Sequence, residues 1–279
     1  MQIRVRSEDG SEVAAYDFGG EGAPLLLGHA TGFHAHLWLP VVRLLADTFH
    51  CYAWDARGHG ASGTPASGDF DWRRSGDDAR ATARAFGLDR PLAAGHSAGA
   101  AALLLAEADH PGSWRALWLY EPVVPDWSGV AGANPLAAGA RRRRDQFASA
   151  DDARRHLGAK PPFNGFTAEA LDLYVEYGFV PAPGGGMTLA CRREDEAATY
   201  EGGVTADARS RLHEVAIRAR VVTGSGRADA RPPGMAEAAA LLPRGELEVL
   251  EGRSHFAPFE DPGAVAASIR AAFATGVAA

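Results

Sequence analysis

The 279-residue chain is poor in cysteine and lysine: it has two cysteines, Cys51 and Cys191, and Lys160 is the single lysine among 28 basic residues. Two cysteines cannot build a disulfide framework or a cysteine-based metal site. No apolar run approaches the roughly 18 residues of a membrane-spanning helix, and the first residues lack the apolar stretch of a secretion signal. We interpret the scarcity of lysine as coding bias. These absences favour a soluble, cytoplasmic protein.

The net charge and the absence of known ligand-binding motifs exclude further classes of protein. The net charge of −7 and the pI near 5.8 give no reason to expect nucleic acid as a partner. There is no P-loop, and the glycines around Ser97 lack the third glycine and the downstream acid of a dinucleotide fingerprint. His34 and His36 alone are a weak metal pattern. We therefore predict neither a metal nor a cofactor.

Short apolar runs alternate with longer helical patterns, which is typical of a mostly parallel sheet covered by helices. The expected strands are 2–6, 12–18, 24–28, 49–55, 91–95, 116–120, 219–224 and 246–251. From about 123 to 216 the pattern changes to helical stretches punctuated by proline and glycine. We expect an α/β core made of 1–122 and 217–279, interrupted by a mainly helical insertion at 123–216.

The residues Gly95-His96-Ser97-Ala98-Gly99 form a G-x-S-x-G pattern between an expected strand and an alanine-rich helix. In that context a sharp turn exposes the serine oxygen, and small neighbours avoid clashes. The helix start also directs its dipole and the Ala98 N–H at developing negative charge. The alternative is a glycine-rich turn with an incidental serine. We predict that Ser97 is a nucleophile.

A serine hydroxyl needs a neighbouring base before it can attack. Of the ten histidines, His255 lies in the glycine-containing loop between the last expected strand and the final helix. That loop and Ser97 are both expected at the carboxyl edge of the sheet. We therefore predict that His255 is the base, whereas His96, beside the nucleophile, has a side chain that should point away from that of Ser97.

Taken together, four segments carry a resemblance to a known family: Gly28-His29, the glycine-rich residues 55–62, the serine turn and residues 252–256. The chain resembles the α/β-hydrolase fold family from end to end. The resemblance implies an eight-stranded, mostly parallel sheet, with the 123–216 insertion as a cap after the sixth strand. It also implies that His29 and His59 support the loops near the reactive serine.

Two carboxylates compete as the acid that orients His255. Asp229 follows the strand 219–224 and precedes His255 by 26 residues, which gives the chain order Ser, Asp, His of this fold. Its loop is longer than the commonest family form. Glu121, which ends the sixth strand, is the rival, because some family members take the acid from there. Asp229 is the expected acid, and Glu121 stays open.

An oxyanion hole needs two donors that face the developing negative charge. The Ala98 N–H is one. The second should come from the loop after His29, where the family more often has His-Gly and this chain has Ala30. Thr31 N–H is the preferred candidate and Phe33 N–H the second.

The substrate is expected to bind between the core and the insertion, where domain interfaces often form apolar clefts. Phe33, Trp38 and Trp127 are the predicted contacts. We expect the substrate to be a small molecule, namely a mid-sized, largely apolar ester, lactone or thioester. We expect the protein to be a monomer or homodimer without membrane partners. The alternatives are C–C bond hydrolysis or a cofactor-free biosynthetic reaction with the same triad, or a non-catalytic ligand-binding homologue. The basic run 141–144 has two interpretations: it could steer an anionic substrate, or it could be a solvated helix face, which we favour.

Overall fold

The computed structural model describes residues 1–124, 134–226 and 234–274. Within them, eight strands form one sheet in the order β1-β2-β4-β3-β5-β6-β10-β11. The two pairings that involve β2 are antiparallel and the others are parallel, which confirms the predicted mostly parallel sheet. In chain order the strands are β1 (Gln2–Arg6), β2 (Glu12–Gly20), β3 (Ala23–Gly28), β4 (Phe49–Trp54), β5 (Leu92–His96), β6 (Leu117–Tyr120), β10 (Ala219–Gly224) and β11 (Gly245–Leu250).

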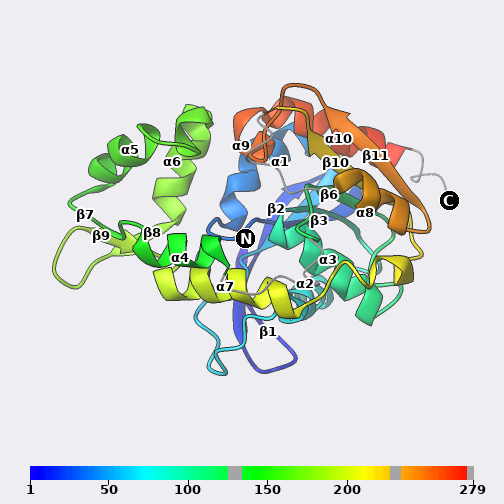
Figure 1. The fold of residues 1–279 in the computed structure, drawn as a ribbon, viewed down its shortest axis with the longest axis horizontal. Helices are drawn as coiled ribbons and strands as arrows, with labels where there is room; N and C mark the ends of the chain where they lie inside the picture. The colour runs from blue at the N-terminus through cyan, green and yellow to red at the C-terminus, as the bar shows by residue number, and fades with distance from the viewer. Residues whose placement is uncertain (125–133, 227–233, 275–279) are drawn as a thin grey trace.

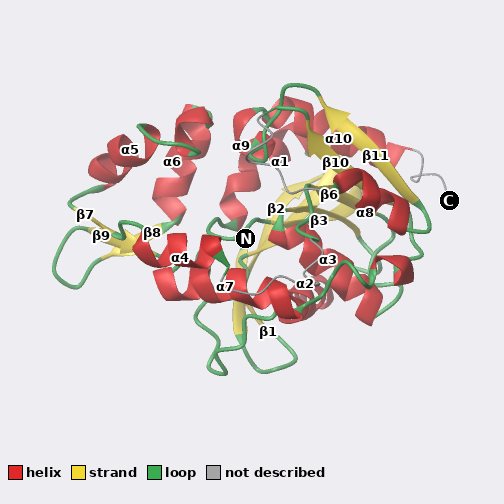
Figure 2. Cartoon of the chain, in the orientation of Figure 1, coloured by secondary structure: helices red, strands yellow, loops and turns green. Residues whose placement is uncertain are grey.

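Helices cover both faces of this sheet (Figures 1 and 2). On one face lie η1 (Ala35–Trp38), α1 (Leu39–Leu45), α9 (Ala257–Glu260) and α10 (Pro262–Ala274), and on the other lie α2 (Trp72–Ala85), α3 (Ala98–Asp109) and α8 (Met235–Leu241). Strand β3 shows how the two cores divide: Leu26 packs in the cluster with α2 and α3, whereas Leu25 and Leu27 pack in the cluster with α1 and α10. Successive side chains of a strand point to opposite faces, so a strand covered on both sides must be apolar throughout. No helix of the described residues is long and apolar enough to cross a membrane.

The insertion between β6 and β10 is largely helical in the described residues. Its elements are α4 (Pro135–Arg142), β7 (Gln146–Phe147), α5 (Ala150–Gly158), η2 (Phe163–Gly165), α6 (Ala168–Tyr177), β8 (Phe179–Pro181), β9 (Met187–Leu189), α7 (Arg193–Thr205) and η3 (Leu212–Glu214). The antiparallel sheet β7-β9-β8 was not predicted, because strands of two or three residues are too short to show alternation. Figure 1 places α5, α6 and this small sheet at the opposite side of the molecule from β11. The division into a core and a separate cap stays a prediction.

The glycine-rich loop after β4 is tied down by two buried polar groups. The carboxylate of Asp55 accepts hydrogen bonds from the Ala35 and Ala61 N–H groups and from the Tyr16 hydroxyl. The Arg57 guanidinium makes a two-pronged ion pair with Asp78 on α2, at 2.9 and 2.7 Å. Buried charges need such partners, because leaving one unpaired costs several kcal/mol. The loop is therefore fixed against the carboxyl edge of the sheet.

Candidate active site

Ser97 lies at the turn where β5 ends and α3 begins. Its backbone has φ 56° and ψ −118°, a conformation that a non-glycine residue adopts only at a cost of about 1–3 kcal/mol. A Cβ on Gly99 would lie 2.5 Å from the His29 carbonyl oxygen, and one on Gly95 would lie 2.6 Å from the Ala100 Cα. The two glycines therefore let α3 approach the strands closely, and that approach holds the serine in its strained turn.

His255 lies in the loop after β11, with Nε2 3.2 Å from the Ser97 hydroxyl oxygen. Two neighbours hold this loop: the Tyr120 hydroxyl donates to the Ser254 carbonyl at 2.5 Å, and His96 Nε2 donates to the His255 carbonyl at 2.8 Å. His96 is fully buried, and burial lowers its pKa well below the usual value. A neutral His96 thus acts as a support for the loop, and the structure brings Ser97 and His255 together as the sequence predicted.

The carboxylate of Glu121 lies on the other side of the His255 ring. Its Oε2 is 2.7 Å from His255 Nδ1, and its Oε1 accepts hydrogen bonds from the Thr223 hydroxyl at 2.8 Å and the Gly224 N–H at 2.9 Å. Glu121 is completely buried and has a left-handed backbone, with φ 42°. Strain of this kind clusters at functional sites, and here it turns the chain off the end of β6 toward His255.

Asp229, the acid expected from the chain order, lies outside the described residues. Among the residues described, the carboxylate on His255 Nδ1 is that of the rival, Glu121. The approach of β10 to the histidine loop depends on Gly224, where a Cβ would collide with the Arg253 carbonyl. Neither this contact nor the turn at Glu121 has a local sequence signal.

Four backbone N–H groups compete for the oxyanion hole. The Gly32 N–H donates to His59 Nε2 at 2.9 Å, and the Phe33 N–H donates to the Ala30 carbonyl at 3.2 Å. Within the described residues, the Thr31 and Ala98 N–H groups have no hydrogen-bond partner. Both residues line one small cavity of about 20 Å³. Of the two sequence candidates in this loop, Thr31 therefore keeps its donor available and Phe33 does not.

Two buried histidines brace the loops beside these donors. His29 Nδ1 donates to the Ala30 carbonyl and its Nε2 accepts from the Ala56 N–H, while His59 Nδ1 donates to the Arg57 carbonyl. Burial lowers the pKa of each ring to about 4. Each ring must stay neutral to accept its N–H bond, so these histidines support the loops.

A cleft of about 510 Å³ lies between the core and the insertion. It is lined by Thr31 from the loop after His29 and by Phe256, the neighbour of His255, so it adjoins the two loops that flank Ser97. Phe33 lines it, as predicted, together with three aromatic residues of the insertion, Phe163, Tyr174 and Tyr200.

The prediction for Trp38 is wrong. Its side chain is 1% exposed and packs in the core on the α1 and α10 face of the sheet, because η1 turns it inward while Phe33 points to the insertion. Trp127 lies outside the described residues.

The cleft is more polar than the sequence suggested. Its lining includes four basic residues, Arg143, Arg144, His156 and Lys160. Among the described residues that line it, Glu196 is the acidic one. Sequence analysis missed this group because its members are separated along the chain and because the lone lysine was attributed to coding bias. The available signal was a lysine in a chain that otherwise uses arginine.

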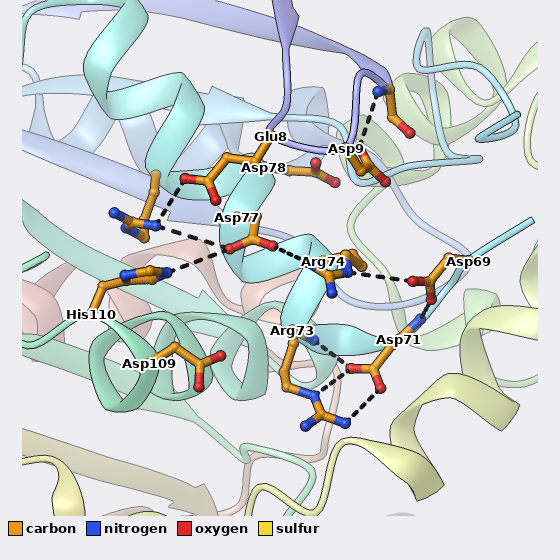
Figure 3. A network of polar contacts seen from close by, with 12 residues as sticks. Glu8, Asp9, Asp69, Asp71, Arg73, Arg74, Asp77, Asp78, Asp109 and His110 are labelled. Atoms are coloured by element: carbon orange, nitrogen blue, oxygen red, sulfur yellow. Dashed lines mark hydrogen bonds and ion pairs between the residues drawn. The ribbon is translucent and has the colours of Figure 1, made fainter. Parts of the chain in front are cut away.

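Away from this cleft, Glu8, Asp77 and His110 lie close enough together to ligate a metal ion. Figure 3 shows that Asp77 lies between His110 and Arg74. Arg80 pairs with Glu8 at 3.1 Å. Arginines therefore already neutralise both carboxylates, and the cluster is an ion-pair network that ties α2 to the loop after β1.

A serine in a strained strand–helix turn, a histidine and carboxylate behind it and an insertion above it together define a class of protein. The model of the Alpha/beta hydrolase family matches residues 25–268, and the chain belongs to that family. Hydrolytic chemistry is the function class that this membership supports.

Individual relatives are distant. A 2-(acetamidomethylene)succinate hydrolase from Mesorhizobium japonicum is 23% identical over 237 residues, which is 85% of this chain and 83% of the relative. The crystal structure of an E-2-(acetamidomethylene)succinate hydrolase has a TM-score of 0.82 at 21% identity, covering 98% of this chain and 99% of the other. The crystal structure of an N-formylmaleamic acid deformylase from Pseudomonas putida S16 has a TM-score of 0.77 at 22% identity. The match covers 96% of this chain and 100% of the deformylase. At these identities the structures establish the fold and not the substrate.

Proposed function

We propose that this protein is a serine hydrolase that cleaves a carboxylic ester or amide with a Ser97-His255-Glu121 triad. The observation that carries the proposal is the unbroken chain of contacts from Ser97 Oγ to His255 Nε2, at 3.2 Å, and from His255 Nδ1 to Glu121 Oε2, at 2.7 Å. In this proposal Glu121 takes the role first expected of Asp229.

The geometry suits acyl transfer to water. His255 Nε2 accepts the Ser97 proton as the serine oxygen attacks the carbonyl carbon, and Glu121 stabilises the imidazolium that forms. The N–H groups of Ala98 and Thr31 are the proposed donors to the oxyanion, each of which is typically worth about 3–4 kcal/mol. His255 then donates its proton to the leaving group, and a water molecule repeats the sequence to release the acid.

The type of bond that is cleaved is proposed first from the chemistry of the site. Esters and amides pass through the same tetrahedral intermediate, so one site serves both. The relatives named above include a deformylase and a hydrolase, which favours including amides in the substrate panel. Because His255 lies within hydrogen-bond reach of both Ser97 and Glu121, the contacts favour an enzyme over a catalytically inactive ligand-binding homologue.

Covalent labelling tests the proposal directly. A serine-directed fluorophosphonate should add one probe mass, located on Ser97 by peptide mass spectrometry, and should abolish hydrolysis of p-nitrophenyl butyrate. The Ser97→Ala variant should lose both labelling and turnover while keeping its melting temperature, because the change removes one oxygen. Labelling on another serine of an active preparation, or full activity in Ser97→Ala, contradicts the proposal.

A further inference from the structure

One end of the cleft is lined by three basic side chains that come from different parts of the insertion. Arg144 follows α4, His156 lies on α5 and Lys160 follows α5. The Lys160 Nζ lies 3.3 Å from His156 Nε2, and an Arg144 guanidinium nitrogen lies 3.4 Å from His156 Nδ1. The imidazole is thus held between two cationic groups.

The charges at this end of the cleft are only partly compensated. Arg144 pairs with Asp152 at 2.5 Å, and Arg143, further along the wall, pairs with Glu196 at 2.6 Å. In the part of the chain that the structure describes, Lys160 has no carboxylate within ion-pair distance. The wall therefore keeps an excess positive charge although the whole chain has a net charge of −7.

Only part of the basic run 141–144 lines the cleft. Arg141, in the same run, pairs across the surface with Glu194 and Glu201 on α7, and Arg142 is exposed and not among the cleft-lining residues. The run therefore divides at the end of α4, with two arginines on the outer surface and two on the cleft.

Like charges at the cleft wall repel one another, and an anion placed between them would relieve that repulsion. Partial burial and the neighbouring Lys160 and Arg144 charges lower the pKa of His156. The site is therefore organised for a ligand group of negative charge.

We propose that this end of the cleft binds a carboxylate of the substrate, with Lys160 and His156 as its partners and Arg144 as a supporting charge. The proposal rests on the proposed function, since it places the reactive carbonyl at Ser97 and the carboxylate in the adjoining cleft. Phe33 and Phe163 supply apolar surface to the same cleft. The substrate class is an ester or amide whose apolar chain ends in a carboxylate, which adds an anionic group to the largely apolar substrate expected from the sequence.

Matched chromogenic esters test this specificity. The p-nitrophenyl monoesters of adipic, pimelic and suberic acid carry a free carboxylate, and their methyl esters are neutral partners of nearly equal size. For the chain length that fits best, kcat/KM should favour the carboxylate by at least about tenfold over its neutral partner. The Lys160→Met variant should lower that ratio by about tenfold, and Lys160→Arg should restore most of it.

Arg142→Met is the control, because it removes a neighbouring charge from outside the cleft, and it should leave the ratio within about twofold of wild type. The ratio should also rise as the pH falls from about 6.5 toward about 5, because the lowered pKa of His156, set among Arg144, Lys160 and Asp152, places its protonation below the ordinary value of 6.5. A ratio near one for every chain length, or one that Lys160→Met leaves unchanged, overturns the proposal while the proposed hydrolase function stands.

A binding measurement separates the two hypotheses if neither ester is hydrolysed. Isothermal titration calorimetry of monomethyl adipate, monomethyl pimelate and monomethyl suberate into the Ser97→Ala protein needs no turnover. Binding that Lys160→Met weakens by about tenfold in this background supports the carboxylate site even without catalysis. Absence of binding, or equal affinity in both proteins, overturns it.

Discussion

Replacement of Glu121 by glutamine should reduce kcat by about 10⁴-fold, as occurs when the acid of other serine triads is converted to its amide. This corresponds to about 5.5 kcal/mol of transition-state stabilisation. The structure explains why the amide cannot simply rotate to compensate. Oε1 of Glu121 accepts the Gly224 N–H at 2.9 Å and the Thr223 hydroxyl at 2.8 Å.

In the variant, the amide oxygen must take the position that faces Gly224, because an NH₂ group there would meet another donor. The NH₂ group is then directed at His255 Nδ1, which lies 2.7 Å from Oε2 in the wild type. A ring nitrogen that accepts has no proton, so the proton moves to Nε2. That nitrogen faces the Ser97 hydroxyl and can no longer act as the base.

The assay is steady-state hydrolysis of p-nitrophenyl butyrate, with thermal unfolding followed by circular dichroism. Glu107→Gln is a matched control: Glu107 is 2% exposed and accepts hydrogen bonds from Gly112 and Trp114 near the far end of α3. This control should lose stability but keep kcat within about tenfold. If Asp229→Asn loses several orders of magnitude while Glu121→Gln stays near wild type, the assignment of the acid is refuted.

Two further predictions concern the loops around Ser97. Gly99→Ala should lower both the melting temperature and kcat, because its Cβ would lie 2.5 Å from the His29 carbonyl oxygen and push apart β3 and the oxyanion loop; unchanged kinetics would argue against the tight approach. The pKa values of about 4 for His29 and His59 lie below the unfolded value of 6.5. Between these values the unfolded chain binds protons that the folded chain does not, so each histidine should remove about 3 kcal/mol of stability as the pH falls across the window. Urea unfolding from pH 7 to pH 4 should show this loss, and His59→Gln should make the pH dependence shallower; an identical slope in the variant would contradict the role assigned to His59.

The positions of Ser97 and His255, the proposed nucleophile and base, could be predicted from the sequence because their signals are local. A buried strand, a serine between glycines and an alanine-rich helix are consecutive in the chain, so geometry and pattern coincide at Ser97. His255 is similarly placed by the strand before it and the helix after it. The mostly parallel sheet was predictable for the same reason, because central strands covered on both faces are apolar runs.

What the sequence could not determine depends on contacts between distant segments. Glu121 meets His255 across 134 residues, through a left-handed turn at the end of β6 and a close approach at Gly224, and neither leaves a pattern in the residues nearby. The direction of the Trp38 side chain, which is set by the turn of η1, also has no local pattern in the sequence. Nor does the set of residues that line the cleft. The sequence shows Arg144, His156 and Lys160 as separate polar residues. Only the tertiary structure, in which Arg144 pairs with Asp152 on α5, brings their side chains to one place. Electrostatic interactions depend on distance in space and not on distance along the chain.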